Sequence, residues 1–202
     1  MEKVTLTNED RTAYQLTLQD DYSRAYTFCD LYREPTVNTT IGAMIATMWE
    51  YQTIPKAVVF DNGPTFSGRR LSAFCLNLDI RLIYTSVRHP QTNGKLERAF
   101  RDDMDEFYRQ HEKWIFGELR RSLPKYVHYR NHIRGHLALG GKPSISRLQE
   151  QDWFALPSVL GQLEEYACYR IGKRTLDEVG GLRVLGRTAV VGYRLRRQEI
   201  TL

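Results

Sequence analysis

The chain has 202 residues, of which 42% are hydrophobic, with a mean hydropathy of −0.49 and a formal net charge of +5. This length and composition indicate a soluble globular protein with one sizeable core and room for a small appended module. No apolar stretch approaches the roughly 20 residues of a membrane span, and the opening Met1-Glu2-Lys3-Val4 does not resemble a signal peptide. We therefore expect a cytoplasmic protein with no membrane partner.

The first quarter of the chain predicts three strands and a helix. Val4–Thr7, Tyr14–Gln19 and Ala25–Tyr32 have strand character and are separated by turn-forming residues, which favours an antiparallel meander. Residues Thr36 to Tyr51 then carry apolar side chains at helical spacing.

The middle of the chain alternates strands with helices. Ala57 to Phe60 is a short apolar run typical of a buried strand, and Ser67 to Leu78 is amphipathic. Arg81 to Thr85 predicts another strand, followed by a loop over Ser86 to Gly94. Lys95 to Gln110 contains neither Pro nor Gly and predicts a helix. Three strands, then helix, strand, helix, strand and helix indicate an α/β fold.

The last part of the chain is helical at first and then changes character. The pattern is helical from Trp114 to Leu119 and, after Pro124, from Tyr126 to Ile133, and it is broken at Gly140-Gly141-Lys142-Pro143. Ile145 to Leu163 then predicts a connecting helical stretch. From Tyr166 short strands are separated by glycines, with Gly180-Gly181 as an expected hairpin turn. We therefore predict three parts, namely a core of residues 1–122, a helical extension of residues 123–165 and a small β module of residues 166–202.

Charge is concentrated in that last module. Residues 166–202 hold eight Lys or Arg and three Asp or Glu, a difference of +5 that equals the net charge of the whole chain. The preceding residues are therefore formally neutral. A basic module beside an acid-bearing core suits the binding of a phosphate backbone, although small surface-rich modules are often basic without such a role.

Two acidic residues stand in distinctive surroundings, with 35 residues between them. Asp61 follows the apolar run Val58-Val59-Phe60 and precedes Asn62-Gly63, while Glu97 lies on the predicted helix that follows the loop. Sites of open α/β sheets gather at the carboxyl ends of strands, so the two carboxylates could converge from a strand end and a helix. Hard cations such as Mg²⁺ prefer oxygen ligands, and two such ions can hold both oxygens of a phosphoryl displacement.

The surrounding motifs make a family resemblance specific. Asp61-Asn62-Gly63, the 35-residue gap and Pro90-Gln91-x-x-Gly94-x-x-Glu97 together resemble the catalytic core of retroviral integrases and insertion-sequence transposases. The resemblance implies an RNase H-like mixed sheet flanked by helices, with an SH3-like barrel in residues 166–202. By position, Asp61 and Glu97 resemble the second and third acids of the family's Asp, Asp, Glu triad.

That resemblance also implies an activity and its partners. The family cleaves the ends of mobile DNA elements and joins them to target DNA, using two Mg²⁺ (or Mn²⁺) ions. We accordingly expect DNA as the substrate, a homo-multimer that holds two DNA ends, and a nucleoid-associated location in the cytoplasm.

Polar residues near Glu97 are candidate DNA ligands. Their side chains offer hydrogen bonds or positive charge to phosphates and unstacked bases. The same residue types are also common on solvated loops and helix surfaces, so both interpretations stay open. The candidates are His89, Gln91, Asn93, Lys95, Arg98 and Arg101.

The first acid of the triad has no convincing candidate. It is expected in the middle of the opening strand, whereas Asp10 lies at a hairpin tip and Asp20 and Asp21 lie in a turn. Glu2 fits the register better but is longer than Asp. The family pattern places the acid at or just before Met1, so we expect a reading frame that begins upstream and a chain that lacks the first catalytic Asp. Alternatives are a DNA-binding remnant without chemistry and a nuclease of the same fold.

Cysteines and histidines do not form a convincing metal pattern. Cys29, Cys75 and Cys168 are isolated in apolar surroundings and are expected to be reduced thiols. His128, His132 and His136 recur at intervals of four but have no acid or thiol companion at a defined spacing. We expect them to pack on a helix or to face DNA.

Overall fold

A computed structural model describes residues 2–6, 11–85, 94–111 and 113–148, together with four short strands after residue 172. Contacts divide the chain into two units, Met1–Leu160 and Gly161–Leu202. Every helix in the described residues is too short or too polar to cross a membrane.

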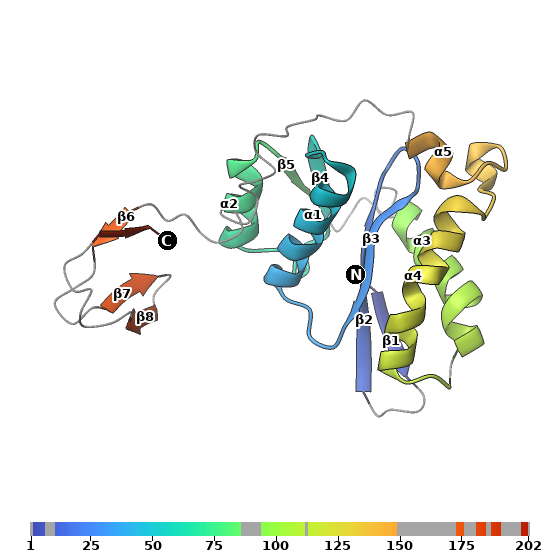
Figure 1. Cartoon of the computed structure of the whole chain (residues 1–202), viewed down its shortest axis with the longest axis horizontal. Coiled ribbons are helices and arrows are strands. Elements are labelled where there is room, and N and C mark those ends of the chain that lie inside the picture. The colour runs from blue at the N-terminus through green and yellow to red at the C-terminus, as the bar shows by residue number, and fades with distance from the viewer. Residues whose placement is uncertain are drawn as a thin grey trace. The chain divides into compact units, whose positions relative to one another are not determined.

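An antiparallel sheet forms the centre of the first unit. Its strands are β1 (Glu2–Leu6), β2 (Arg11–Gln19) and β3 (Tyr26–Tyr32), in the order β1-β2-β3. Both faces of β2 are buried, because Gln15 and Leu16 point to opposite sides of the sheet and each is at most 1% exposed. The sheet is therefore covered on both faces, with α1 on one side and α3 and α4 on the other (Figure 1).

Helix α1 (Val37–Tyr51) leads from this sheet into a second one. Its start is fixed by a capping box, in which Thr36 and Thr39 exchange side-chain to backbone hydrogen bonds. The second sheet pairs β4 (Ala57–Phe60) with β5 (Arg81–Tyr84) in parallel. The crossover between them is made by α2 (Arg69–Asn77), as parallel neighbours require.

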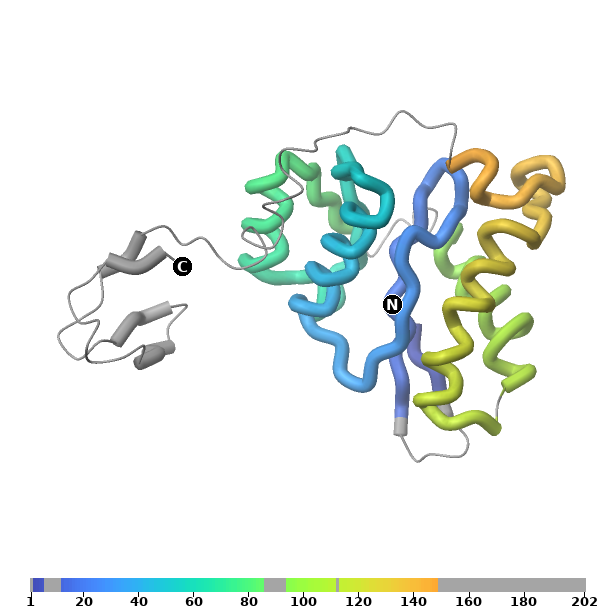
Figure 2. Tube along the Cα trace, in the orientation of Figure 1, coloured from blue at the N-terminus to red at the C-terminus, as the bar shows by residue number. Residues whose placement is uncertain are grey.

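The second half of the unit is helical. The segments are α3 (Gly94–Asp103), the π-helix η2 (Met104–Tyr108), the 3₁₀ turn η3 (Arg109–His111), α4 (Phe116–His132), the 3₁₀ turn η4 (Leu137–Leu139) and α5 (Ser144–Leu148). The tube in Figure 2 shows α3 and α4 lying side by side against the first sheet. Val4, Ala13 and Leu31 of that sheet join Phe107, Leu119, Leu123 and Tyr126 in one hydrophobic cluster. This cluster anchors the helical layer to the sheet.

The second unit contains two antiparallel strand pairs. β6 (Lys173–Thr175) pairs with β9 (Glu199–Thr201), and β7 (Gly181–Val184) pairs with β8 (Arg187–Val190). The predicted turn at Gly180-Gly181 is wrong, because Gly181 is paired with Val190 and residues 185–186 separate the two strands. A barrel is not formed by the strands that the structure describes.

The order of strands and helices predicted for the core is the observed one, with two corrections. The described strands form a three-stranded and a two-stranded sheet instead of one mixed sheet, since no hydrogen-bonded pairing joins β1 to β4 among them. The helix predicted for residues 95–110 changes at Met104 into a π-helix, whose wider turn lets both Phe107 and Tyr108 face the core. Pro124 lies within α4 on its exposed side, while Leu119 and Leu123 on the opposite side pack in the core.

Candidate active site

Asp61 lies directly after β4, at the carboxyl end of the strand as predicted. Its side chain is half-buried, and its Oδ1 accepts a hydrogen bond of 2.8 Å from the backbone N–H of Gly63. No other hydrogen bond or ion pair reaches this carboxylate from the described residues. Asp61 therefore offers its second oxygen to a ligand.

Gly63 is needed for this geometry. A Cβ atom at this position would stand 2.7 Å from Asp61 Oδ1, closer than real Cβ contacts allow. Asn62 lies between these two residues and makes a different contact. Its Nδ2 donates a 3.0 Å hydrogen bond to the carbonyl of Thr85, just after β5. The Asp-Asn-Gly triplet thus turns the chain, fixes Asp61 and joins the ends of two strands.

Glu97 lies in the first turn of α3 and is exposed. It makes no hydrogen bond or ion pair with any residue that the structure describes. The buried side of α3 is formed by Ala99, Phe100 and Asp103, which places Glu97 on a flank of the helix and not on its core-facing side. Both predicted acids are thus accessible carboxylates without a basic partner in the described part of the chain.

Both acids have the oxygen chemistry that Mg²⁺ or Mn²⁺ prefers. However, the described residues contain no group of three or more His, Cys, Asp or Glu side chains arranged to hold a metal ion. Asp61 and Glu97 therefore fit the cations by ligand type, and the two cations expected from the resemblance stay a proposal.

The candidate DNA ligands fall into two groups. His89, Gln91 and Asn93 lie outside the described residues. Lys95, Arg98 and Arg101 lie on α3 with exposed side chains. Lys95 is engaged, because its Nζ is 2.7 and 2.8 Å from the two carboxylate oxygens of Asp21.

The acids considered for the missing triad position have different surroundings. Glu2 is half-buried on β1 and pairs with Gln15 of β2. Asp20 has a structural task, since its Oδ2 accepts hydrogen bonds of 2.7 Å from both the N–H and the hydroxyl of Ser23. Asp21 binds Lys95, and Asp10 lies outside the described residues.

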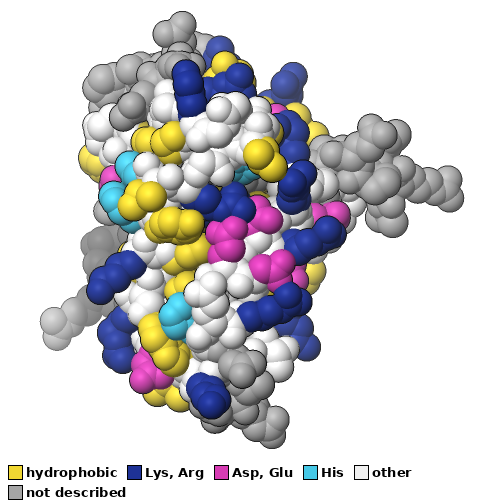
Figure 3. Space-filling model, turned by 90° about the vertical axis from the view of Figure 1, so that its right-hand side faces the viewer, with side chains coloured by type: hydrophobic (Ala, Val, Ile, Leu, Met, Phe, Trp, Pro, Cys, Tyr) yellow, Lys and Arg dark blue, Asp and Glu magenta, His cyan; other side chains and the backbone are white. Residues whose placement is uncertain are grey.

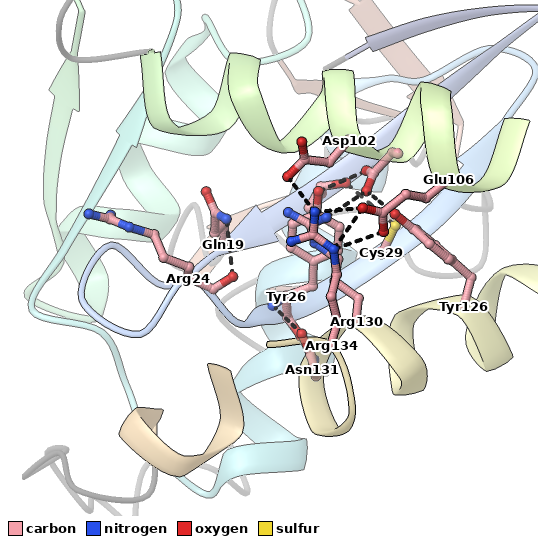
Figure 4. A network of polar contacts seen from close by, with 12 residues as sticks. Gln19, Arg24, Tyr26, Cys29, Asp102, Glu106, Tyr126, Arg130, Asn131 and Arg134 are labelled. Carbon is pink, nitrogen blue, oxygen red and sulfur yellow. Dashed lines mark hydrogen bonds and ion pairs between the residues drawn. The ribbon is translucent and has the colours of Figure 1, made fainter. Parts of the chain in front are cut away.

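A buried polar network, which sequence reasoning missed, holds α3 in place (Figure 4). Asp103 accepts hydrogen bonds of 2.7 to 2.9 Å from Gln15, Tyr26 and Tyr126, and lies 3.2 Å from the guanidinium of Arg130. Burial raises the pKa of Asp103, while Arg130 and these donors act in the opposite direction. Its sequence signal is weak, since Asp103 occupies a core-facing position of an otherwise apolar helix side.

Arg134 forms a second connection one turn further along. Its guanidinium binds both carboxylate oxygens of Glu106 at 2.8 Å through Nε and reaches Asp102 at 3.1 Å. The surface in Figure 3 accordingly shows Asp and Glu side chains gathered near its middle, with Lys and Arg beside them. Arg130 and Arg134 together fix the helix that carries Glu97 against the end of α4.

The histidines of α4 do not form a metal cluster with other described residues. His128 and His132 stack on the exposed side of the helix, with ring centroids 4.4 Å apart. His136 lies beyond the helix, where burial lowers its pKa. Cys29 and Cys75 are free thiols as predicted, and Cys168 lies outside the described residues.

A sequence match supports the family resemblance. Residues 32–112 match the family described as the TnsB C-terminal domain. This segment runs from the last residue of β3 to the residue after η3, and it contains both Asp61 and Glu97.

Solved structures with a similar fold include retroviral integrases. A chain of the simian T-cell lymphotropic virus intasome in complex with PP2A regulatory subunit B56 gamma matches with 15% identity and a TM-score of 0.57, over 72% of this chain and 51% of that chain. This chain thus spans about half the length of that intasome chain.

Two isolated catalytic cores match over most of their length. The BIV integrase core has 20% identity and a TM-score of 0.55, over 74% of this chain and 92% of that chain. The HTLV-2 integrase core in complex with magnesium, in a trimeric form, has 15% identity and a TM-score of 0.55, over 72% and 91%. The α/β arrangement of the first unit is therefore that of an integrase catalytic core.

Proposed function

Because residues 32–112 match the TnsB C-terminal domain and the fold is that of integrase catalytic cores, we propose that the chain acts in DNA integration or transposition by cleaving element ends and joining them to target DNA. One observation carries the proposal. Asp61 at the end of β4 and Glu97 in the first turn of α3 are accessible carboxylates, and neither is neutralised by a described Lys or Arg.

The two acids are the proposed cation ligands. Two Mg²⁺ (or Mn²⁺) ions at Asp61 and Glu97 would stabilise charge on the attacking and leaving oxygens of the phosphate. The similar HTLV-2 integrase core was solved in complex with magnesium, which supports this choice. The N–H of Gly63 orients Asp61, and the Arg130 and Arg134 connections hold the helix of Glu97.

The remaining residues bind and orient DNA in this proposal. Lys95, Arg98 and Arg101 present positive charge along the exposed side of α3, and His89, Gln91 and Asn93 precede that helix in sequence. Phosphate contacts of this kind fix the position of a strand without reading its sequence.

The proposal also covers the partners of the chain and the role of its second unit. We expect a homo-multimer, as the dimeric and trimeric forms of the HTLV-2 core suggest, working on DNA in the cytoplasm. The basic β module of residues 166–202 is proposed to be an SH3-like barrel that adds phosphate contacts. Asp20 is not proposed as the first acid of the triad, because its carboxylate is used within its own turn.

A strand-transfer assay with end-labelled DNA tests the proposal. Asp61→Asn and Glu97→Gln should each abolish joining while leaving DNA binding within about two-fold of the parent chain, since a lost catalytic carboxylate removes transition-state stabilisation and not substrate contacts. Glu50→Gln is the matched control, because Glu50 is an exposed acid on α1. Joining by Asp61→Asn at the parent rate would refute the assignment.

Two other outcomes identify the alternatives. Hydrolysis of the labelled strand without joining would indicate a nuclease of the same fold. Binding of DNA with neither reaction, in the parent chain, would indicate a DNA-binding remnant.

A further inference from the structure

The contact between Lys95 and Asp21 connects two parts of the chain that are 74 residues apart. Lys95 lies in the first turn of α3, two residues before Glu97, and Asp21 lies in the turn between β2 and β3. The Lys95 Nζ is 2.7 Å from Oδ1 and 2.8 Å from Oδ2 of Asp21. Two oxygens on one anionic group thus face the ammonium, as two oxygens of a phosphate would.

The turn that carries Asp21 is held by several hydrogen bonds. The Asp20 carboxylate accepts two from Ser23, and the backbone N–H of Asp20 donates to the carbonyl of Ala25 at 2.9 Å. Arg24 closes the turn in a left-handed conformation with φ of 67°. On the other side, the guanidinium of Arg147 in α5 lies 4.7 Å from the ring of Tyr22. Asp21 is therefore presented to Lys95 by a fixed backbone.

The ion pair is open to solvent. The Asp21 side chain is 83% exposed and that of Lys95 is 43% exposed. Exposed pairs of this kind contribute little to stability, so a competing anion can displace one partner. A DNA phosphate gains in addition from the release of counterions when a lysine binds it.

Lys95 and Glu97 lie on opposite flanks of α3. Residues two positions apart in an α-helix are separated by about 200° around its axis. With Lys95 held toward the β2–β3 turn, Glu97 points to the other flank. A DNA strand that contacted both flanks would therefore cross the exposed surface of the first turn of α3, between Lys95 and the proposed catalytic acid.

We propose that Asp21 competes with the DNA backbone for Lys95 and thereby weakens DNA binding at the start of α3. Asp21 holds Lys95 in the absence of DNA and releases it to a phosphate that arrives in register. This inference rests on the proposed function, since it requires DNA as the ligand. Asp21 is an affinity-setting residue in this scheme and does not take part in the reaction.

DNA binding by the full chain tests the competition. Fluorescence anisotropy with a labelled duplex is measured from about 50 to 200 mM salt, the range in which phosphate contacts dominate. Asp21→Asn should bind about three-fold more tightly at low salt, within the range expected for one exposed ion pair. Lys95→Gln should bind more weakly, with a salt slope smaller by about 0.9.

A double variant, Asp21→Asn with Lys95→Gln, measures whether Asp21 affects DNA affinity through Lys95. Asp21→Asn should have no effect in the Lys95→Gln background if Asp21 acts through Lys95. The matched control is Asp105→Asn, which removes the same charge from another exposed ion pair, that with Arg109. The control should leave affinity within about 1.5-fold of the parent, as its position lies beyond the first two turns of α3.

Three results would overturn the inference. They are weaker binding by Asp21→Asn, unchanged binding by Asp21→Asn, and an equal gain in the Lys95→Gln background. Asp21→Ser repeats the test without an amide, and far-UV circular dichroism checks that each variant is folded. A parent chain that does not bind DNA would refute the proposed function and the competition together, whereas a parent that binds DNA with no gain in Asp21→Asn would refute the competition alone.

Discussion

The carboxylate of Asp103 lies 3.2 Å from the guanidinium of Arg130 at the interface of α3 and α4, and their side chains are only 1% and 2% exposed. The guanidinium also stacks on the ring of Tyr26, 4.3 Å from its centroid. Removing one partner from such a pair leaves a buried charge without compensation, which is far more destabilising than losing an exposed pair.

Arg130→Met should therefore reduce the free energy of unfolding by about 3–5 kcal/mol at neutral pH. Urea denaturation followed by far-UV circular dichroism measures this loss. Arg109→Met is the control, because Arg109 pairs with Asp105 on the exposed surface and its loss should remain under about 1 kcal/mol. Equal losses in the two variants would contradict a special role for the buried pair.

The loss of unfolding free energy in Arg130→Met should also depend on pH. Burial raises the pKa of Asp103 and Arg130 opposes that rise, so the variant should have a still higher pKa at Asp103. A carboxyl whose folded pKa is raised favours the folded state while protonated, and this stability is lost as pH rises from the unfolded pKa toward the folded one. The difference between parent and variant should thus be small near pH 4 and grow toward neutral pH. If the difference in unfolding free energy between parent and variant shrank with rising pH, Arg130 would not be opposing the raised pKa of Asp103.

Gly63→Ala should disturb Asp61 without unfolding the protein. The new Cβ would meet Asp61 Oδ1 at 2.7 Å, so the carboxylate must turn away and lose its 2.8 Å hydrogen bond from the N–H of residue 63. We expect strand transfer to fall at least ten-fold, while stability falls by about 1 kcal/mol, the typical value of one hydrogen bond.

Gly42→Ala provides the control for that substitution. Gly42 is exposed on α1, and a Cβ there would meet nothing within 4 Å. Alanine should raise helix stability by up to about 1 kcal/mol and leave strand transfer unchanged. Parent-like activity in Gly63→Ala would show that the turn does not set the orientation of Asp61.

Two cysteines should resist alkylation in the folded protein. Burial raises the pKa of the Cys75 thiol to about 11 and also raises that of Cys29. At pH 8 about one Cys75 in a thousand would be a thiolate, the form that reacts. Iodoacetamide treatment followed by peptide mass spectrometry should find both residues unmodified in the native chain and modified in urea. Comparable labelling rates in the two conditions would contradict the raised pKa of both thiols.

Local patterns predicted the elements because each depends mainly on its own residues. The apolar run before Asp61 predicted β4, and the helical spacing after Gly94 predicted the helix that carries Glu97. The π-helix at Met104 had no local signal, since it depends on how Phe107 and Tyr108 pack against the sheet and α4.

The sequence predicted which residues belong to the candidate site, but it did not predict the contacts that surround them. Asp61 and Glu97 were proposed from their motifs, but the contacts that hold α3, the helix of Glu97, come from distant parts of the chain. Lys95 meets Asp21 across 74 residues, and Asp103 meets Gln15 across 88. Such pairs follow from the arrangement of the layers, which no single segment encodes.

The hydrogen bond from Asn62 to the carbonyl of Thr85 has a consequence for spacing within the site. Thr85 is the last described residue before positions 86–93, which include three of the candidate DNA ligands. The amide of Asn62 therefore fixes the position of Thr85 relative to Asp61, the neighbouring metal-ligand candidate. Exchanging Asn62 for a residue of another length would shift Thr85 relative to Asp61, even with every charged group left in place.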